Sequence, residues 1–68
     1  MRNHVRQLRT QHAWTQEELA QQLSVSRQTI IAIESGKYDP SLPLAFRIAR
    51  VFALRVDEVF MDSDGDGI

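Results

Sequence analysis

Apolar residues recur at spacings of three and four along almost the whole chain, which is the period of an amphipathic helix. No stretch alternates apolar and polar residues in the way that a half-buried strand does. Together with the start and stop signals between the apolar runs, this pattern predicts five short helices. They cover roughly residues 2–12, 15–23, 26–35, 41–52 and 56–60. The sequence therefore predicts an all-α fold, in the form of a compact five-helix domain.

The second and third helices are joined by a very short connection. Thr15 can cap the second helix, and Glu18, three residues later, completes a capping box. Ser26 caps the third helix after a turn of about three residues, and Gly36 ends it. Two helices joined so tightly cross steeply and leave the second one partly exposed. Residues 16–35 are thus predicted to form a helix-turn-helix unit.

The third helix contains two adjacent isoleucines, which cannot both face one narrow core because neighbours on a helix point about 100° apart. A hydrophobic staple between Val25 and Ile30 turns Ile30 inward, and Ile33 shares that buried face. The opposite face carries Arg27, Gln28, Ile31 and Ala32.

Arginine and glutamine form bidentate pairs with guanine and adenine, and small apolar groups can meet a thymine methyl. The position of this face at the start of the helix suits a helix that enters the major groove by its N-terminal end. The alternative on geometry alone is that Arg27 and Gln28 are ordinary surface residues and that Ile31 contacts a neighbouring loop or subunit.

The charge is unevenly distributed along the 68 residues, although the net value is only −1. All eight basic residues precede Val56, against four acidic ones there, whereas five acidic residues and no basic one follow. A body of +4 beside a C-terminal region of −5 can present a positive face to phosphates. The chain contains no cysteine, membrane-length apolar run or signal-peptide pattern, so we expect a soluble cytoplasmic protein.

Several segments resemble one family when read in order. "TQEELA", "VSRQTI", "IESGK", "PSLPLAFRIARVF" and "DEVF" are similar in order and spacing to the Cro and phage-repressor-like (Xre) helix-turn-helix transcriptional regulators, especially the short stand-alone members. The resemblance runs from about Val5 to Phe60. It implies a lambda-repressor-like DNA-binding domain over residues 5–60 of a single 1–68 domain. The composition of residues 61–68 separately predicts an acidic, flexible tail.

The resemblance also implies roles for individual residues. The third helix becomes the recognition helix, and its base-contacting residues would be Arg27, Gln28, Ile31 and Ala32. The residues expected to contact phosphate are Thr15, Gln16, Ser26, Ser35, Lys37 and Tyr38. Arg9 and Glu34 match a family ion pair that joins the first helix to the end of the third and fixes its register.

The chain departs from the family pattern at four turn positions. Ala13, Ser24 and Ala53 stand where glycine often ends the first, second and fourth helices. Either these turns use another geometry, or each residue is held in the left-handed region at a cost of roughly 1 kcal/mol. Arg55 replaces a usual capping residue, which leaves the start of the last helix open.

Other chemistries have weaker support. "DSDGDG" resembles the first half of a calcium-binding EF-hand loop but lacks the glutamate at position twelve and the second helix. His4 and His12 have no third metal ligand, and no nucleophile–base pair is evident. We therefore expect no metal, no cofactor and no enzymatic activity.

The sequence thus predicts a sequence-specific double-stranded DNA-binding regulator, a repressor that acts as a homodimer on a palindromic operator and needs no small-molecule ligand. The dimer surface is expected around Val56, Phe60 and Met61, with Phe60 either at the surface or in the core. The alternative is a protein-interaction module on the same fold, such as an antitoxin, whose main partner is protein.

Overall fold

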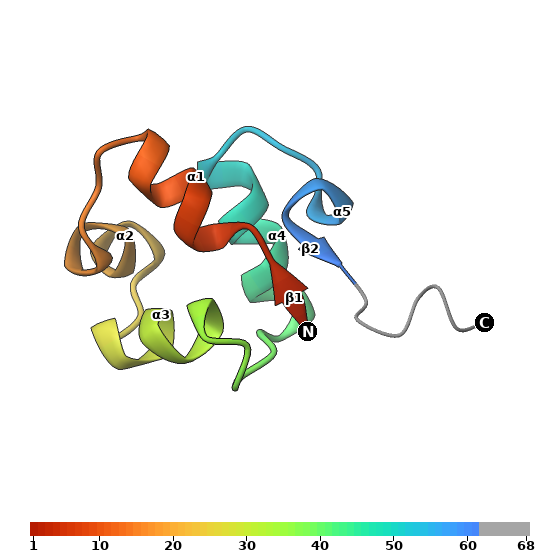
Figure 1. The fold of residues 1–68 in the computed structure, drawn as a ribbon, viewed down its shortest axis with the longest axis horizontal. Helices are drawn as coiled ribbons and strands as arrows, with labels where there is room; N and C mark the ends of the chain where they lie inside the picture. Colours follow the sequence, from red (N-terminus) through yellow and green to blue (C-terminus); the bar gives the residue numbers. More distant parts are fainter. Residues whose placement is uncertain (62–68) are drawn as a thin grey trace.

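The computed structural model describes residues 1–61, so the predicted acidic, flexible tail lies outside the described residues except for Met61, which is part of a strand. It confirms the five predicted helices and adds one pair of strands (Figure 1). The elements in chain order are β1 (Arg2–Asn3), α1 (Val5–Gln11), α2 (Gln16–Leu23), α3 (Arg27–Glu34), α4 (Leu42–Val51), α5 (Val56–Val59) and β2 (Phe60–Met61). Within residues 1–61, no helix is long and apolar enough to cross a membrane.

The start of the chain differs from the prediction of a helix from residue 2. Arg2 and Asn3 form an antiparallel pair with Met61 and Phe60, so the two ends of the described chain lie side by side (Figure 1). The Asn3 side chain accepts a hydrogen bond from the Val5 backbone amide at 3.0 Å, which favours a helix start at Val5. Two-residue strands are too short to produce an alternating pattern, so the sequence carries no signal for them.

The predicted helix starts are formed as expected. The Glu18 backbone amide donates to the Thr15 hydroxyl at 3.0 Å, and the Thr15 amide donates to the Glu18 carboxylate at 2.7 Å, which completes the capping box. The Ser26 hydroxyl accepts from the Thr29 amide at 3.1 Å. Ser41 caps α4 in the same way. These bonds satisfy backbone amides that a helix start otherwise leaves without a partner.

The core lies where all five helices meet. Its buried apolar residues are Val5, Leu19, Ala20, Leu23, Ile30, Ile33, Leu44, Ala45, Ile48, Ala49, Phe52, Val59 and Phe60. Ile30 is fully buried and Ile31 is partly exposed, as the staple with Val25 predicts. Arg47 of α4 donates a hydrogen bond to the Leu23 carbonyl at the end of α2, which ties α4 to the turn between α2 and α3.

Three non-glycine residues occupy the left-handed region at helix ends. Ala13, Ser24 and Ala53 have φ values of 58°, 57° and 57°. The turns therefore keep the geometry for which glycine is preferred, and each side chain adds strain between its Cβ and the next carbonyl. Of the two alternatives, another turn geometry or a strained left-handed residue, the structure supports the strained residue, which costs stability at these sites.

Replacing all three residues with glycine is expected to raise the free energy of unfolding by about 2 kcal/mol, because the relief of strain exceeds the added entropy of the unfolded chain. In a domain of this size that corresponds to an increase of roughly 10 °C in melting temperature. Urea and thermal unfolding followed by circular dichroism would measure it. Gln21→Gly, within α2, is the matched control and should lower stability by about 1 kcal/mol. A triple variant less stable than the native chain would contradict the prediction.

Candidate nucleic-acid interface

The N-terminal end of α3 lies at the surface. Arg27 and Gln28 are exposed, and Ile31 and Ala32 are partly exposed. Ile30 and Ile33, on the other side of the helix, pack into the core against α2 and α1. Because Ile30 and Ile33 are buried in the core, the opposite face of α3 points toward solvent, as the sequence predicted.

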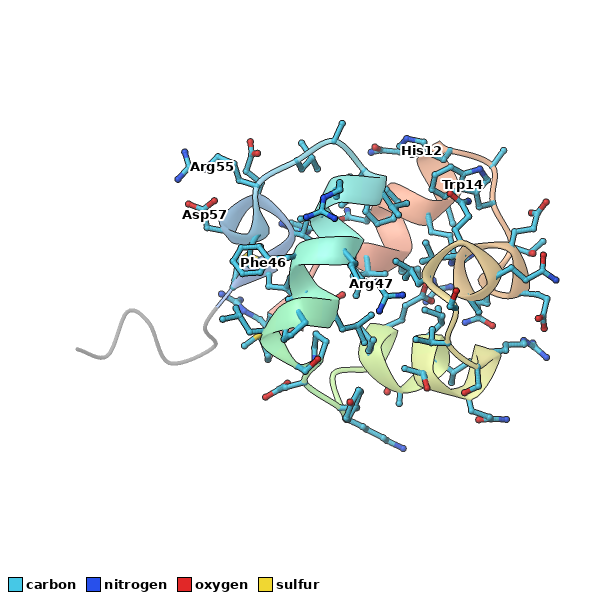
Figure 2. All side chains as sticks on the ribbon, turned by 180° about the vertical axis from the view of Figure 1, so that it is seen from behind. His12, Trp14, Phe46, Arg47, Arg55 and Asp57 are labelled. Atoms are coloured by element: carbon cyan, nitrogen blue, oxygen red, sulfur yellow. The ribbon has the colours of Figure 1, made fainter. Side chains whose placement is uncertain are left out.

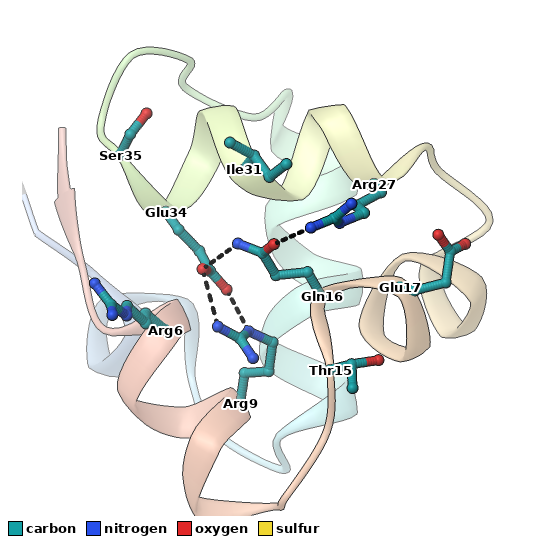
Figure 3. A pocket seen from close by; sticks show the side chains of 9 residues that line it. All are labelled: Arg6, Arg9, Thr15, Gln16, Glu17, Arg27, Ile31, Glu34 and Ser35. Atoms are coloured by element: carbon teal, nitrogen blue, oxygen red, sulfur yellow. Dashed lines mark hydrogen bonds and ion pairs between the residues drawn. The ribbon is translucent and has the colours of Figure 1, made fainter.

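An open groove of about 810 Å³ runs between α1, the start of α2 and α3 (Figure 3). On the α3 side, the row Arg27, Ile31 and Ser35 lines it at intervals of four residues. Its remaining lining residues are Arg6, Arg9, Thr15, Gln16, Glu17 and Glu34. Three arginines and two glutamates therefore face the groove, and the site has more positive than negative charge.

Arg9 and Glu34 form an ion pair at the floor of this groove. The Arg9 Nε and Nη2 atoms donate to the two carboxylate oxygens of Glu34 at 2.6 and 3.2 Å. Arg9 also donates to the Trp14 carbonyl at 2.9 Å. The side chains are 12% and 6% exposed, so both charges are largely removed from water and depend on each other. This pair joins α1 to the end of α3.

Polar contacts continue from this pair to the surface. The Gln16 amide nitrogen donates to Glu34 at 3.2 Å, and Arg27 donates to the Gln16 side-chain oxygen at 3.5 Å (Figure 3). Gln16 is the first residue of α2, and Arg27 is the first residue of α3. The starts of both helices in the helix-turn-helix unit therefore share one network.

The residues predicted to contact phosphate fall into two groups. Three of them line the groove: Thr15, Gln16 and Ser35. The others, Ser26, Lys37 and Tyr38, lie outside its lining, on exposed segments at the two ends of α3. The backbone amides of Lys37 and Tyr38 both donate to the Ala32 carbonyl, at 3.1 and 3.2 Å, which holds this loop close to the end of α3.

Arg6 was not identified from the sequence, although the structure places it in the groove. It is exposed, lies one turn before Arg9 on α1 and faces the end of α3 (Figure 3). Among the ion pairs within residues 1–61, none involves Arg6 or Arg27. The spacing of three residues between Arg6 and Arg9 was the available signal, since it places both on one side of the helix.

A second, apolar groove of about 960 Å³ lies on α4, α5 and β2. Phe46 is 50% exposed there, beside Arg55 and Asp57 at the same end of the molecule (Figure 2). Val56, Phe60 and Met61 also line it. Phe60 is only 7% exposed, so it belongs to the core and contributes one edge to this surface.

The two histidines make local contacts. His4 Nδ1 lies 2.8 Å from the Gln7 side-chain oxygen, and His12 Nδ1 lies 2.9 Å from the Leu8 carbonyl. In the part of the chain that the structure describes, no group of three His, Asp or Glu side chains is placed to hold a metal ion. The calcium hypothesis concerns residues 62–67, which lie outside that part.

Comparison with known proteins gives a consistent family assignment. Residues 5–59 match the family described as helix-turn-helix. The chain is 53% identical over 66 residues to an uncharacterized HTH-type transcriptional regulator, MJ0272, of Methanocaldococcus jannaschii, covering 97% of this chain and 100% of that protein. It is 43% identical to the uncharacterized HTH-type transcriptional regulator YgzD of Bacillus subtilis, covering 88% of this chain and 91% of that protein.

A solved structure shares the fold. The restriction-modification controller protein C.AhdI from Aeromonas hydrophila has a TM-score of 0.76 and 28% identity, with 84% of this chain and 86% of that chain covered. The resemblance inferred from the sequence is therefore confirmed. The chain belongs to the Xre-like helix-turn-helix family of DNA-binding transcriptional regulators.

Proposed function

We propose that this protein is a repressor that reads an operator through the major groove with α3. The observation that carries the proposal is the exposed N-terminal end of α3, where the side chains of Arg27 and Gln28 are open to solvent beside a groove that has more positive than negative charge. Both side chains can form paired hydrogen bonds with base edges. Binding over a promoter is sufficient to exclude RNA polymerase, so repression needs no activity beyond DNA binding, and no catalytic chemistry is proposed.

The surface around α3 supports a division between base and phosphate contacts. Arg27, Gln28, Ile31 and Ala32 would meet base edges, because they form the exposed face of the helix. Thr15 and Gln16 lie at the start of α2, where backbone amides favour an anion. The remaining proposed phosphate contacts are Ser26, Ser35, Lys37 and Tyr38, and we also propose Arg6, because it is exposed and lines the groove. Phosphate contacts of this kind position the protein and supply the salt-dependent part of the affinity.

We further propose that two copies bind a palindromic operator in the cytoplasm and meet through the apolar groove on α4, α5 and β2. The half-exposed Phe46 and the lining residues Val56 and Met61 supply apolar area that a second copy would bury. One module of this size makes few base contacts, so two half-sites about one helical turn apart raise the affinity to a useful level.

Selection of binding sites from a random double-stranded DNA pool, at near-physiological salt, tests this function. An enriched inverted repeat with half-site centres about one turn apart is the expected result. Weak, salt-sensitive retention without an enriched sequence would contradict it. That outcome would favour the alternative in which the main partner is a protein.

Phe46→Glu tests the dimer surface. The substitution removes the apolar ring and places a carboxylate in the contact, where the loss of water around the charge costs free energy even beside Arg50 and Arg55 of the same groove, so we expect a monomer in analytical ultracentrifugation. Because the two half-sites would then be bound independently, the affinity for the palindrome should fall on the order of 100-fold, with little change on an isolated half-site. Gln22→Glu, an exposed position on α2, is the control with the same added charge. A dimer that survives Phe46→Glu would place the interface elsewhere.

A further inference from the structure

The side chain of Asn3 joins the start of α1 to the end of α3. Its amide nitrogen donates to the Ile33 carbonyl, in the last turn of α3, at 2.9 Å. Its side-chain oxygen accepts from the Val5 backbone amide at 3.0 Å. A carbonyl only accepts and a backbone amide only donates, so these two partners fix the orientation of the asparagine amide. The carbonyl that Asn3 binds is one of the four that the end of a helix leaves outside its own hydrogen-bond ladder.

Asn3 is itself held in place by the strand pair. Its backbone pairs with Phe60 of β2, and the following amide, that of His4, donates to the Val59 carbonyl at 2.9 Å. Val59 is fully buried and Phe60 is 7% exposed, so the partners of this segment belong to the core. Asn3 therefore links the core to the end of α3 from a point outside the helix-turn-helix unit.

The loop after α3 begins at the same carbonyl. The Gly36 amide donates to the Ile33 carbonyl at 3.0 Å, and the amides of Lys37 and Tyr38 donate to the carbonyl one residue earlier. Gly36 has a φ of 80°, and the Met1 carbonyl lies 3.5 Å from the position that a β-carbon would take there. The segment that leads into β1 thus lies directly against this loop.

We propose that Asn3 is a positioning residue that holds the loop of residues 35–38 where Lys37 and Tyr38 contact DNA phosphate. The inference rests on the proposed function, in which this loop contacts phosphate. A loop that is already ordered loses less conformational entropy when it binds, so the bond from Asn3 to Ile33 raises the affinity. Because phosphate contacts carry no sequence information, Asn3 should strengthen binding to every DNA and leave base preference unchanged.

Asn3→Ser separates this role from a purely local one at the start of α1. The serine hydroxyl can still accept a bond from the Val5 amide, but it is too short to reach Ile33. Gln7→Ser is the matched control, because it makes the same change from amide to hydroxyl at an exposed position of α1 whose side chain contacts His4. All measurements are made well below the melting temperature of each variant.

Two readouts are combined. Backbone amide hydrogen exchange, followed by NMR on the free protein, reports the order of residues 36–38 without DNA. Fluorescence anisotropy on the selected operator, on operators changed at each base pair and on random DNA, at several salt concentrations, reports binding. Each affinity is measured again in a background that carries Lys37→Ala and Tyr38→Phe, which removes the proposed phosphate contacts of the loop.

In Asn3→Ser, the amides of residues 36–38 should exchange about threefold faster or more, with no change at the start of α3. Affinity should fall by about threefold on operator and random DNA alike, with the same base preference. Asn3→Ser should have no further effect in the background without the loop contacts. Gln7→Ser should change neither readout.

Unchanged exchange in the loop would overturn the inference, as would unchanged affinity for DNA. A loss that persists in the background variant, or one confined to the operator, would also overturn it, because Asn3 would then act through other contacts. If the background variant itself binds DNA as tightly as the native chain, the phosphate role proposed for the loop fails, and the inference fails with it. The inference alone fails if the background variant weakens binding and Asn3→Ser does not.

Discussion

Glu34→Ala is expected to lower the free energy of unfolding by about 3–5 kcal/mol, because it leaves the Arg9 guanidinium without a counter-charge in a largely dry site. Arg9 is 12% exposed, so water cannot replace the two lost hydrogen bonds without opening the contact between α1 and α3. The variant would also remove the acceptor for Gln16. A loss of this size is a large part of the stability of a small domain, which makes partial unfolding near 37 °C the expected outcome.

Urea unfolding followed by circular dichroism measures this change, with Glu17→Ala as the matched control. Glu17 lines the same groove but is exposed and takes part in none of the ion pairs within residues 1–61. Its removal should change stability by less than about 0.5 kcal/mol. If the two variants were equally stable, the pair could not be a structural link between α1 and α3.

A second comparison separates the cost of an unpaired charge from the net contribution of the pair. Arg9→Met combined with Glu34→Leu removes both charges and keeps apolar volume. Because the desolvation of both ions is avoided, this double variant should recover most of the stability that Glu34→Ala loses. We therefore expect the pair to set the position of α3 rather than to add much net stability.

The helices were predictable because their signals are local. The capping box of Thr15 and Glu18 and the cap of Ser26 each depend on residues within one turn, and both form as predicted. The strand pair was not predictable, since Arg2 and Asn3 meet residues almost sixty positions away through backbone bonds that depend little on side-chain type. The start of the chain is extended because it pairs with the distant strand β2, and a two-residue strand leaves no periodic pattern in the sequence.

The candidate site was predictable to the extent that one helix determines it. The exposed face of α3 follows from the burial of Ile30 and Ile33, which periodicity indicates. The groove depends on how α1 and α2 sit against α3, and this arrangement brings in Arg6 and connects Gln16 to Arg27. The sequence left two geometries open for the three left-handed turns, because alanine and serine, unlike glycine, do not indicate a left-handed conformation.

Arg27→Ala combined with Gln28→Ala is expected to reduce binding to the selected operator by about 3–5 kcal/mol, which brings it close to the affinity for random DNA. Each side chain is expected to contribute about 1–3 kcal/mol through its base contacts. Both are exposed and neither packs in the core, so the fold and its melting temperature should be kept. Fluorescence anisotropy on operator and random DNA, at several salt concentrations, measures the change.

Lys37→Ala is the contrasting variant, because Lys37 lies on the exposed loop after α3 and is proposed to contact phosphate. Its loss should weaken binding to operator and random DNA by the same factor and reduce the salt dependence by about one ion. The double variant at Arg27 and Gln28 should instead lose most of the difference between the two DNAs. Equal losses on both DNAs from both variants would mean that α3 does not read bases. If neither variant changes binding and Phe46→Glu removes it, the functional partner is recognised through the apolar groove and not through α3.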